Sequence, residues 1–191
     1  MSDFRTGNGA DWLDWLATLL GRYQPTQVEM LSDPAAVQAW LAEHGMEPVT
    51  AVSAADLQAA RSLREAMHRT AAAVMRGRSP AVSDVRILQE ALAWDQPLRI
   101  RRTGSELQLT RPADASVALG RLARQAAVDL TGPTRERLRA CGDDTCSGIF
   151  IDHTGRRRWC SDERCGVRAR VRAHRARART GEPRTAKKGR P

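Results

Sequence analysis

The residues of this 191-residue chain that are best suited to chemistry are four cysteines near its C-terminal end. They form two pairs, each with four residues between its members, and thirteen residues separate the pairs. Structural zinc takes four thiolate or imidazole ligands at the corners of a tetrahedron, and two closely spaced pairs can supply them. The spacing therefore predicts a structural Zn²⁺ site made by Cys141, Cys146, Cys160 and Cys165.

Other uses of these cysteines are two disulfides, thiols that are only buried, and an iron–sulfur cluster. In a reducing cytosol, closely spaced cysteines favour metal or redox chemistry over disulfides, and the spacing is not typical of a cluster. His153 lies between the pairs and could act as a ligand, but four thiols already complete a site, so a solvated turn residue is favoured. A redox switch that releases the metal would require an exposed site.

The segment around the cysteines predicts a small finger. Residues 149–151 and 157–159 are expected to form two short strands joined by a turn at 152–155. Ser161 is a suitable N-cap, and the two acidic residues after it favour a helix start, which places Cys165 in the first turn. The finger is therefore expected to present two ligands from a loop and two from the entry into a helix.

Three other residues of the finger are expected to lie near the metal. Gly142 and Gly148 are predicted to let the chain bend there, because glycine accepts positive φ at little cost. Trp159, next to Cys160, is expected to pack beneath the metal as a small core, with stacking on nucleic acid as an alternative.

An arginine-rich segment follows the cysteines directly. Residues 156–191 contain 14 Lys and Arg and 3 Asp and Glu, a net charge of +11. The rest of the chain therefore holds 31 − 14 = 17 basic and 22 − 3 = 19 acidic residues, a net charge of −2. This asymmetry indicates that the C-terminal end recognises a polyanion.

Helical spacing arranges this segment into stripes. Val167, Val171, His174 and Ala178 form a narrow ridge that is expected to dock on the finger, while arginines project on both sides. A solvated charged helix is the alternative. Solvated helix faces usually carry both positive and negative side chains, however, and no acidic residue follows Glu163 in this helix. The candidate contacts to a phosphate backbone are Arg156, Arg157, Arg158, Arg164, Arg168, Arg172, Arg175 and Arg179.

The upstream part of the chain must position this module, and its periodicity is mainly helical. One segment departs from this, because apolar and polar residues alternate on both sides of a Gly-containing turn at 103–105, which predicts a β-hairpin. Helices are predicted over 10–20, from Asp33–Pro34 to His44–Gly45, from Ser53 to Gly77, over 80–94 and over 114–130. The fold class expected is mainly α with a small β-hairpin.

Three regions are predicted from these signals. Thr131–Gly132–Pro133 ends the last helix and suggests a boundary, so residues 1–133 are expected to form a helical domain and residues 134–179 the finger. Residues 180–191 lack apolar side chains and are expected to be a disordered basic tail. No apolar run reaches the ~18 residues of a membrane span, and the N-terminus does not have the order of a signal peptide, so a cytoplasmic protein is expected.

The residues of the finger resemble a known family. The string from Trp159 to Arg168, with the upstream cysteine pair and the arginines that follow, is similar to the CGNR zinc finger, whose name-giving Cys-Gly-Asn-Arg reads Cys165-Gly166-Val167-Arg168 here. The early helix, the segment AAVQAWLAEHG, the long helix with Leu63-Arg64-Glu65 and the late hairpin resemble the ABATE domain of proteins proposed to be stress-induced bacterial transcription regulators. The two resemblances cover nearly the whole chain.

The resemblance implies a treble-clef-like or ribbon-like finger that binds DNA. The chain departs from the family pattern at two places. Val167 replaces the asparagine of the motif and removes an amide that could fix the helix start or contact a base edge. Leu16-Ala17-Thr18 stands where relatives commonly carry Asn-Thr, so a ligand role of that asparagine is absent.

These observations bear on three classes of function. The favoured one is a DNA-binding transcription regulator, located at the nucleoid, whose N-terminal domain senses a small-molecule effector or forms a homodimer, because one finger offers few base contacts. The alternative is an RNA- or ribosome-associated zinc protein, since arginine helices also bind RNA. An enzyme is not expected, because four thiolates leave zinc no open position for water, and His44 and His68 belong to no catalytic constellation.

Overall fold

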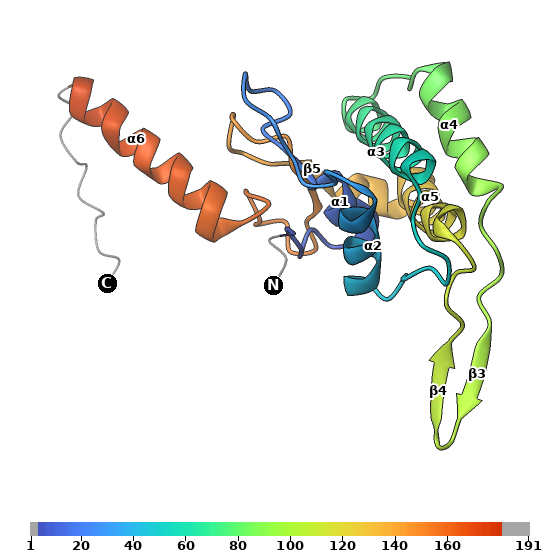
Figure 1. Cartoon of the computed structure of the whole chain (residues 1–191). Helices are drawn as coiled ribbons and strands as arrows, with labels where there is room; N and C mark the ends of the chain where they lie inside the picture. Colours follow the sequence, from blue (N-terminus) through green and yellow to red (C-terminus); the bar gives the residue numbers. More distant parts are fainter. Residues whose placement is uncertain (1–3, 181–191) are drawn as a thin grey trace.

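The computed structural model describes residues 4–180 and has a helical body from which the C-terminal helix and a β-hairpin project (Figure 1). The helices of the body are α1 (Asp11–Leu16), α2 (Pro34–Glu43), α3 (Ala54–Met75), α4 (Val82–Leu92) and α5 (Ala115–Thr131). The strands form three antiparallel pairs: β1 (Leu19–Leu20) with β2 (Val28–Glu29), β3 (Ile100–Thr103) with β4 (Glu106–Leu109), and β5 (Leu138–Ala140) with β6 (Ile149–Ile151). A 3₁₀ turn (Pro133–Arg137), a π-helical turn (Asp162–Gly166) and helix α6 (Val167–Thr180) complete the described chain.

Local capping chemistry explains where three helices begin. The side chain of Asp33 accepts a hydrogen bond from the amide of Ala36, and proline occupies the first helical position of α2. Ser53 and Asp56 form a reciprocal capping box at the start of α3. Asp114 caps α5 in the same way as Asp33 caps α2. These starts and the mainly helical fold class were predicted correctly from the sequence.

The core of the body is built around tryptophans. Trp12, Trp15 and Trp40 are completely buried, and the rings of Trp15 and Trp40 meet edge to face with their centroids 4.7 Å apart. The apolar faces of α3 and α5 pack in the same cluster. The body therefore gains most of its stability from the burial of large apolar side chains.

The first helix is shorter than predicted. It was expected over residues 10–20, but α1 ends at Leu16, and the next residues form β1 against β2. The hydroxyl of Thr18 donates to the carbonyl of Trp15, and the amide of Met30 donates to the carbonyl of Thr18, so that the chain leaves the helix here. Apolar spacing alone does not distinguish this helix-to-strand change, because Leu19 and Leu20 of the strand continue the apolar spacing of the helix.

The predicted hairpin is present and projects from the body (Figure 1). Ile100 pairs with Leu109 and Arg102 pairs with Leu107, and the turn lies at Gly104, which has a φ of +60°. Every residue of both strands is exposed to solvent. This part of the chain is therefore well formed but uncovered.

The strand pairing of the finger differs from the prediction. Residues 149–151 form a strand, but they pair with residues 138–140 and not with 157–159. The reason is burial: Leu138, Ile149 and Ile151 are part of the same hydrophobic cluster as the body. The predicted boundary after Pro133 thus separates two segments that share one core.

No helix within residues 4–180 is long and apolar enough to cross a membrane. The predicted disordered tail, residues 180–191, lies outside the described residues apart from Thr180, which ends α6.

Candidate metal centre and arginine helix

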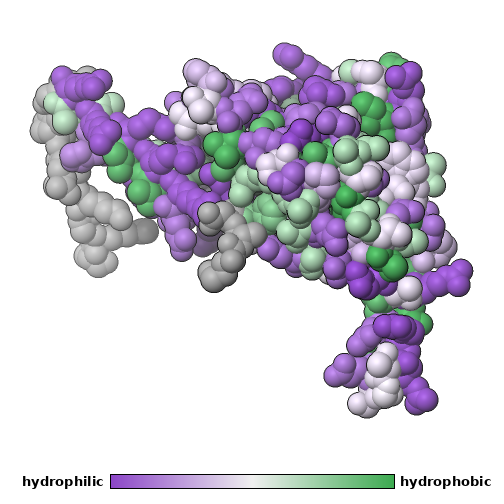
Figure 2. Space-filling view, viewed as in Figure 1, coloured by the Kyte–Doolittle hydropathy of each residue, from purple (hydrophilic) through white to green (hydrophobic). Residues whose placement is uncertain are grey.

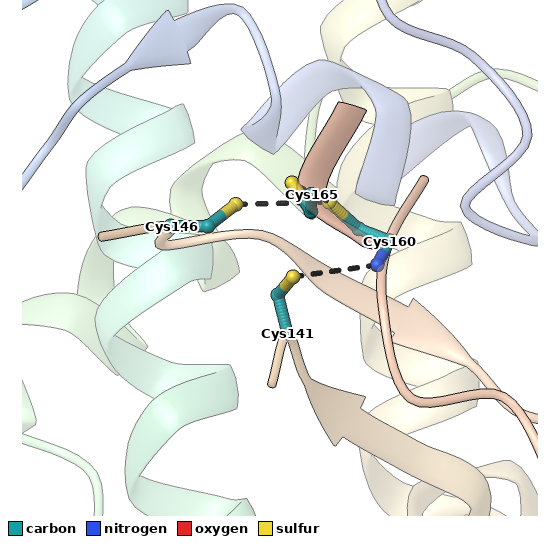
Figure 3. Close-up of side chains that lie close together, drawn as sticks. All are labelled: Cys141, Cys146, Cys160 and Cys165. Atoms are coloured by element: carbon teal, nitrogen blue, oxygen red, sulfur yellow. Dashed lines mark hydrogen bonds between the residues drawn. The ribbon is translucent and has the colours of Figure 1, made fainter. Parts of the chain in front are cut away.

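The four cysteines meet at one point between the finger loops. Their side chains point toward one another from the end of β5, from the following loop and from the entry into the π-helical turn (Figure 3). All four sulfur atoms lie within 4.8 Å of one another. The structure therefore brings together the whole predicted ligand set, and in the described part of the chain no other group of His, Cys, Asp or Glu side chains does the same.

The distances between the sulfur atoms match a tetrahedral thiolate site. The Sγ atoms of Cys146 and Cys160 are 3.6 Å apart, and those of Cys160 and Cys165 are 3.5 Å apart. A tetrahedron with Zn–S bonds of about 2.3 Å has edges of about 3.8 Å. A disulfide requires about 2.05 Å between the sulfur atoms, and all four cysteines are free. The geometry excludes the disulfide alternative and fits a four-coordinate metal.

The pKa shifts of the clustered thiols also favour a bound cation. Hydrogen bonding from Cys146 and Cys160 lowers the pKa of the Cys141 thiol. The same hydrogen bonding, now with Cys141 and Cys146 as the charged partners, raises the pKa of the Cys160 thiol. A thiolate at one cysteine therefore disfavours ionisation of the neighbouring thiol. A divalent cation would offset this repulsion and stabilise all four sulfur atoms as thiolates.

Two glycines of the finger allow close approach of neighbouring atoms, a reason that differs from the prediction. A Cβ atom at Gly148 would lie 2.9 Å from the Cys160 sulfur, and one at Gly142 would lie 2.9 Å from the Arg158 carbonyl oxygen. Neither glycine has positive φ. Their role is close approach and not a left-handed backbone. The amide of Gly148 also donates to the Cys146 sulfur at 3.3 Å.

A buried aspartate fixes the orientation of helix α6. Asp143 lies between the first two cysteines and is completely buried. Its carboxylate accepts hydrogen bonds from the guanidinium of Arg168 at 2.9 Å and from that of Arg172, and also from Thr145. Burial alone would raise the pKa of Asp143, but the hydrogen bonds from Arg172, Thr145 and Arg168 outweigh it and hold the pKa well below its usual range.

Arg168 joins this network to the sulfur cluster. Its second guanidinium nitrogen lies 3.1 Å from the sulfur of Cys165 and 2.8 Å from the carboxylate of Asp143. A positive charge here stabilises a thiolate at Cys165. Asp143 was not among the residues predicted to be functional. A signal existed, because the loop between the first cysteines carries two acidic residues while the helix carries arginines four positions apart.

The predicted docking of helix α6 is therefore wrong. Val167 and Val171, the predicted docking ridge, are 44% and 42% exposed. The face of α6 that contacts the finger carries Arg168 and Arg172 instead. Ion pairing with a buried carboxylate outweighs the burial of a ridge that contains only two valines. Figure 2 shows a mostly hydrophilic surface over α6 with a few hydrophobic side chains among the polar ones.

The eight predicted phosphate contacts fall into two groups. Arg157 donates to the carbonyls of Trp159, Cys160 and Gly7 and lies over the Phe150 ring, so it holds the finger together, as do Arg168 and Arg172. Within residues 4–180, the other side chains make no hydrogen bond or ion pair; Arg158 only lies over the ring of Trp159. This second group is Arg156, Arg158, Arg164, Arg175 and Arg179.

Two smaller predictions about the finger have different outcomes. His153 is an exposed turn residue and lies outside the sulfur cluster, as expected. Trp159 was expected to be a small core, but it is half-buried, and the guanidinium groups of Arg158 and Arg170 lie 5.1 Å and 5.5 Å from its ring. Arg170 also pairs with Asp162, so the ring supports a charged pair next to the helix start.

Asn8 and His68 make two of the polar contacts that attach the finger to the body. The amide of Ile151 donates to the carbonyl of Asn8, and the Asn8 amide donates to the buried carboxylate of Asp14. His68 of α3 is 3% exposed and its Nε2 donates to the carbonyl of Ser147 at 3.1 Å. Burial, with a further contribution from the nearby charge of Arg22, lowers the pKa of His68 to about 4, so the ring is neutral at pH 7.

A cavity of about 620 Å³ lies beside the sulfur cluster, between the N-terminal segment and the finger. Phe4, Leu16 and Leu19 line it on the side of the body. On the side of the finger it reaches Cys160 and Arg164. Its volume lies in the range of small-molecule sites.

Comparison with known proteins assigns both parts of the chain. Residues 9–133 match the ABATE family, described as "Putative stress-induced transcription regulator". Residues 137–178 match the CGNR zinc finger. No curated protein is similar enough to the chain to count as a match. The resemblance recognised in the sequence is confirmed in both parts.

Proposed function

Because this chain belongs to the ABATE family and carries a CGNR zinc finger, we propose that it is a DNA-binding transcription regulator. The observation that carries the proposal is the convergence of four thiols at the start of an arginine-rich helix. In this proposal Cys141, Cys146, Cys160 and Cys165 hold one structural Zn²⁺. With a metal bound, these four side chains would hold the entry into α6 in place, so that the helix could lie against nucleic acid.

The arginines of the finger and of α6 have two different roles in this proposal. Arg168 and Arg172 are paired with Asp143 and orient the helix. Arg164, Arg175 and Arg179, together with Arg156 and Arg158, are available to neutralise phosphates and release counterions. Duplex DNA is favoured as the partner, since transcription regulation is the role named in the family's description. The protein would then act at the nucleoid in the cytoplasm.

The N-terminal domain is proposed to sense a signal. The cavity beside the sulfur cluster supports this role, because a ligand there would contact both the body and the finger. Binding at such a junction changes how firmly the finger is held, which is one way for an effector to alter DNA affinity. A panel of small molecules tested by thermal shift on the zinc-loaded protein would identify an effector.

We infer that the protein is not an enzyme. The histidines of the body have structural partners: His44 stacks on Trp40 and contacts its carbonyl, and His68 donates to Ser147. Four thiolate ligands would leave a bound zinc ion without an open position for water.

The decisive experiment measures nucleic-acid binding by the zinc-loaded chain. Fluorescence anisotropy with a random-sequence duplex DNA, between about 50 and 200 mM salt, should show an affinity that falls steeply as salt rises. Structured RNA of the same charge should compete more weakly than duplex DNA. Selection from a randomised DNA pool should then enrich a common sequence. Stronger binding to RNA would instead support an RNA-associated protein, and no binding to either would reject the proposal.

A further inference from the structure

The β3–β4 hairpin is a projecting arm with an uncovered face. Its base is fixed to the body, because the amides of Val49 and Thr50 donate to the carbonyls of Pro112 and Ala113. The guanidinium of Arg111 donates to the carbonyls of the loop before α3, at Pro48 and at its neighbour. Beyond this base, every residue of both strands is exposed (Figure 1).

The register gives the arm two different faces. Residues that pair directly, and residues two apart, share one face of a hairpin. Ile100, Leu107 and Leu109 therefore lie on one face, and they are 65%, 73% and 57% exposed. Leu98 continues this face toward the base and is 47% exposed. The opposite face is polar and carries Arg99, Arg101, Thr103, Glu106 and Gln108.

An isolated two-stranded hairpin is marginally stable in water unless one of its faces is covered. Here four large apolar side chains are exposed side by side, and Arg102 is the one charged residue among them. A contiguous apolar face of this kind indicates a protein contact. We infer that this face is the dimer interface of the protein and that it stacks on the same face of a second copy.

The charge distribution favours a second copy over a polyanion. A nucleic acid would be attracted to the face with Arg99 and Arg101, which leaves the apolar face uncovered. Two copies related by a two-fold axis, with their arms antiparallel, place Leu107 near the tip of one arm over Leu98 at the base of the other. The two Arg102 side chains then lie at opposite ends, each near the base of the partner's arm. There Glu47 pairs with Arg111 of its own chain at 3.1 Å, and its side chain is still 43% exposed, so the carboxylate can accept a second guanidinium.

This inference deepens the proposed function but is measured independently of it. A dimer doubles the number of finger contacts with DNA, which a single finger needs for useful specificity. The arms and α6 project from different sides of the body (Figure 1), so stacking of the arms leaves both fingers accessible. Each interface is small, so the dimer should dissociate with a constant on the order of 10 μM.

Sedimentation equilibrium of the zinc-loaded full chain, without nucleic acid, tests the dimer. Between about 1 and 200 μM the wild type should pass from monomer to dimer. Leu107→Glu places a charge on the apolar face and should raise the dissociation constant at least ~100-fold. Gln108→Glu is the matched control, because it adds the same charge to the same strand on the polar face; it should leave the constant within about threefold.

A photo-crosslinking residue at position 107 locates the contact. It should yield a covalent dimer whose linked peptide contains residues 98–109 of the second copy. A monomer at every concentration, equal effects of the two glutamate variants, or cross-links to the helical body would overturn the inference. Nucleic-acid binding by the Leu107→Glu monomer should persist, so a failure of the dimer and a failure of the proposed function give different results.

Discussion

The helical body and the finger are stabilised in opposite ways. The body encloses three completely buried tryptophans and long apolar helix faces. The loops of the finger instead depend on four thiols, a buried aspartate with two arginine partners, and hydrogen bonds from Arg157 to backbone carbonyls. A segment of about 40 residues is too small to supply its own hydrophobic core. The difference predicts that the body folds without a metal, whereas the loops of the finger need one.

Metal removal should produce the largest difference between the two regions. Chelation with excess EDTA, or Cys160→Ser, should unfold the finger loops and the 14-residue helix α6, because metal binding is coupled to folding in such sites. The body should remain folded and melt at a slightly lower temperature, since Ile149 and Ile151 belong to its core. Far-UV circular dichroism measures the helix loss, and near-UV circular dichroism of the buried tryptophans follows the body. A metal-free chain that retained α6 would contradict the four-cysteine assignment.

A pH titration should reveal the next largest effect, at the junction of the two regions. His68 has a pKa of about 4 in the folded protein and an ordinary value of 6.5. Between these two pKa values His68 is protonated in the unfolded chain but not in the folded chain. The free energy of unfolding therefore falls as the pH falls from 6.5 toward 4. The loss should reach about 3 kcal/mol near pH 4.

The wild type should therefore lose more stability between pH 6.5 and pH 4 than His68→Gln does. Urea denaturation at each pH measures this difference. His153→Gln, at an exposed turn, is the control and should follow the wild type. Parallel pH curves for the wild type and His68→Gln would show that the His68 contact does not form.

Asp143→Asn should weaken the finger by about 2 kcal/mol while the body is unaffected. The substitution keeps the shape but removes the charge that pairs with Arg168 and Arg172; the value is moderate because these arginines are 44% and 40% exposed. Competition with a chromophoric chelator should show zinc affinity reduced roughly 30-fold. Asp144→Asn in the same loop, where the carboxylate is 82% exposed, should change it little. Equal effects at the two positions would contradict the role of the buried carboxylate.

Replacing Arg175 and Arg179 by alanine should have the smallest effect, on DNA affinity alone. Neither side chain has a partner among residues 4–180, so stability and zinc content should stay unchanged. Affinity for duplex DNA should fall about 10-fold, and the slope of log affinity against log salt should flatten by roughly two units. Arg76 and Arg78 on the body provide a control with the same change in charge. An unchanged slope would mean that the end of α6 does not face phosphate.

The parts of the fold that follow from local chemistry were predictable from the sequence. Asp33–Pro34 and Ser53 cap their helices through side chains within three residues of the amides they bind. The set of four cysteine ligands was equally predictable from the sequence, because only a short loop separates the two ligands of each pair. In each case the physical cause lies within a few residues along the chain.

The rest depended on contacts between distant residues. The strand at 149–151 pairs with 138–140 because the two share the core of the body, which sequence spacing does not encode. The face of α6 was predicted from its valines, but the outcome was decided by Asp143, 25 residues before its partner Arg168. Helical periodicity describes the faces of a helix, and only a competing interaction elsewhere in the chain selects the face that packs.

The contact between Asn8 and Ile151 has a consequence for the synthesis of the chain. The carbonyl of Asn8 accepts a hydrogen bond from the amide of Ile151, which lies 143 positions later in the chain. The carbonyl of Gly7 likewise accepts one from Arg157, which is also synthesised much later. The N-terminal segment therefore leaves the ribosome long before its partner exists. Such non-local contacts form late and slow the final folding step. We expect the body to reach its complete native structure only after translation has passed the finger.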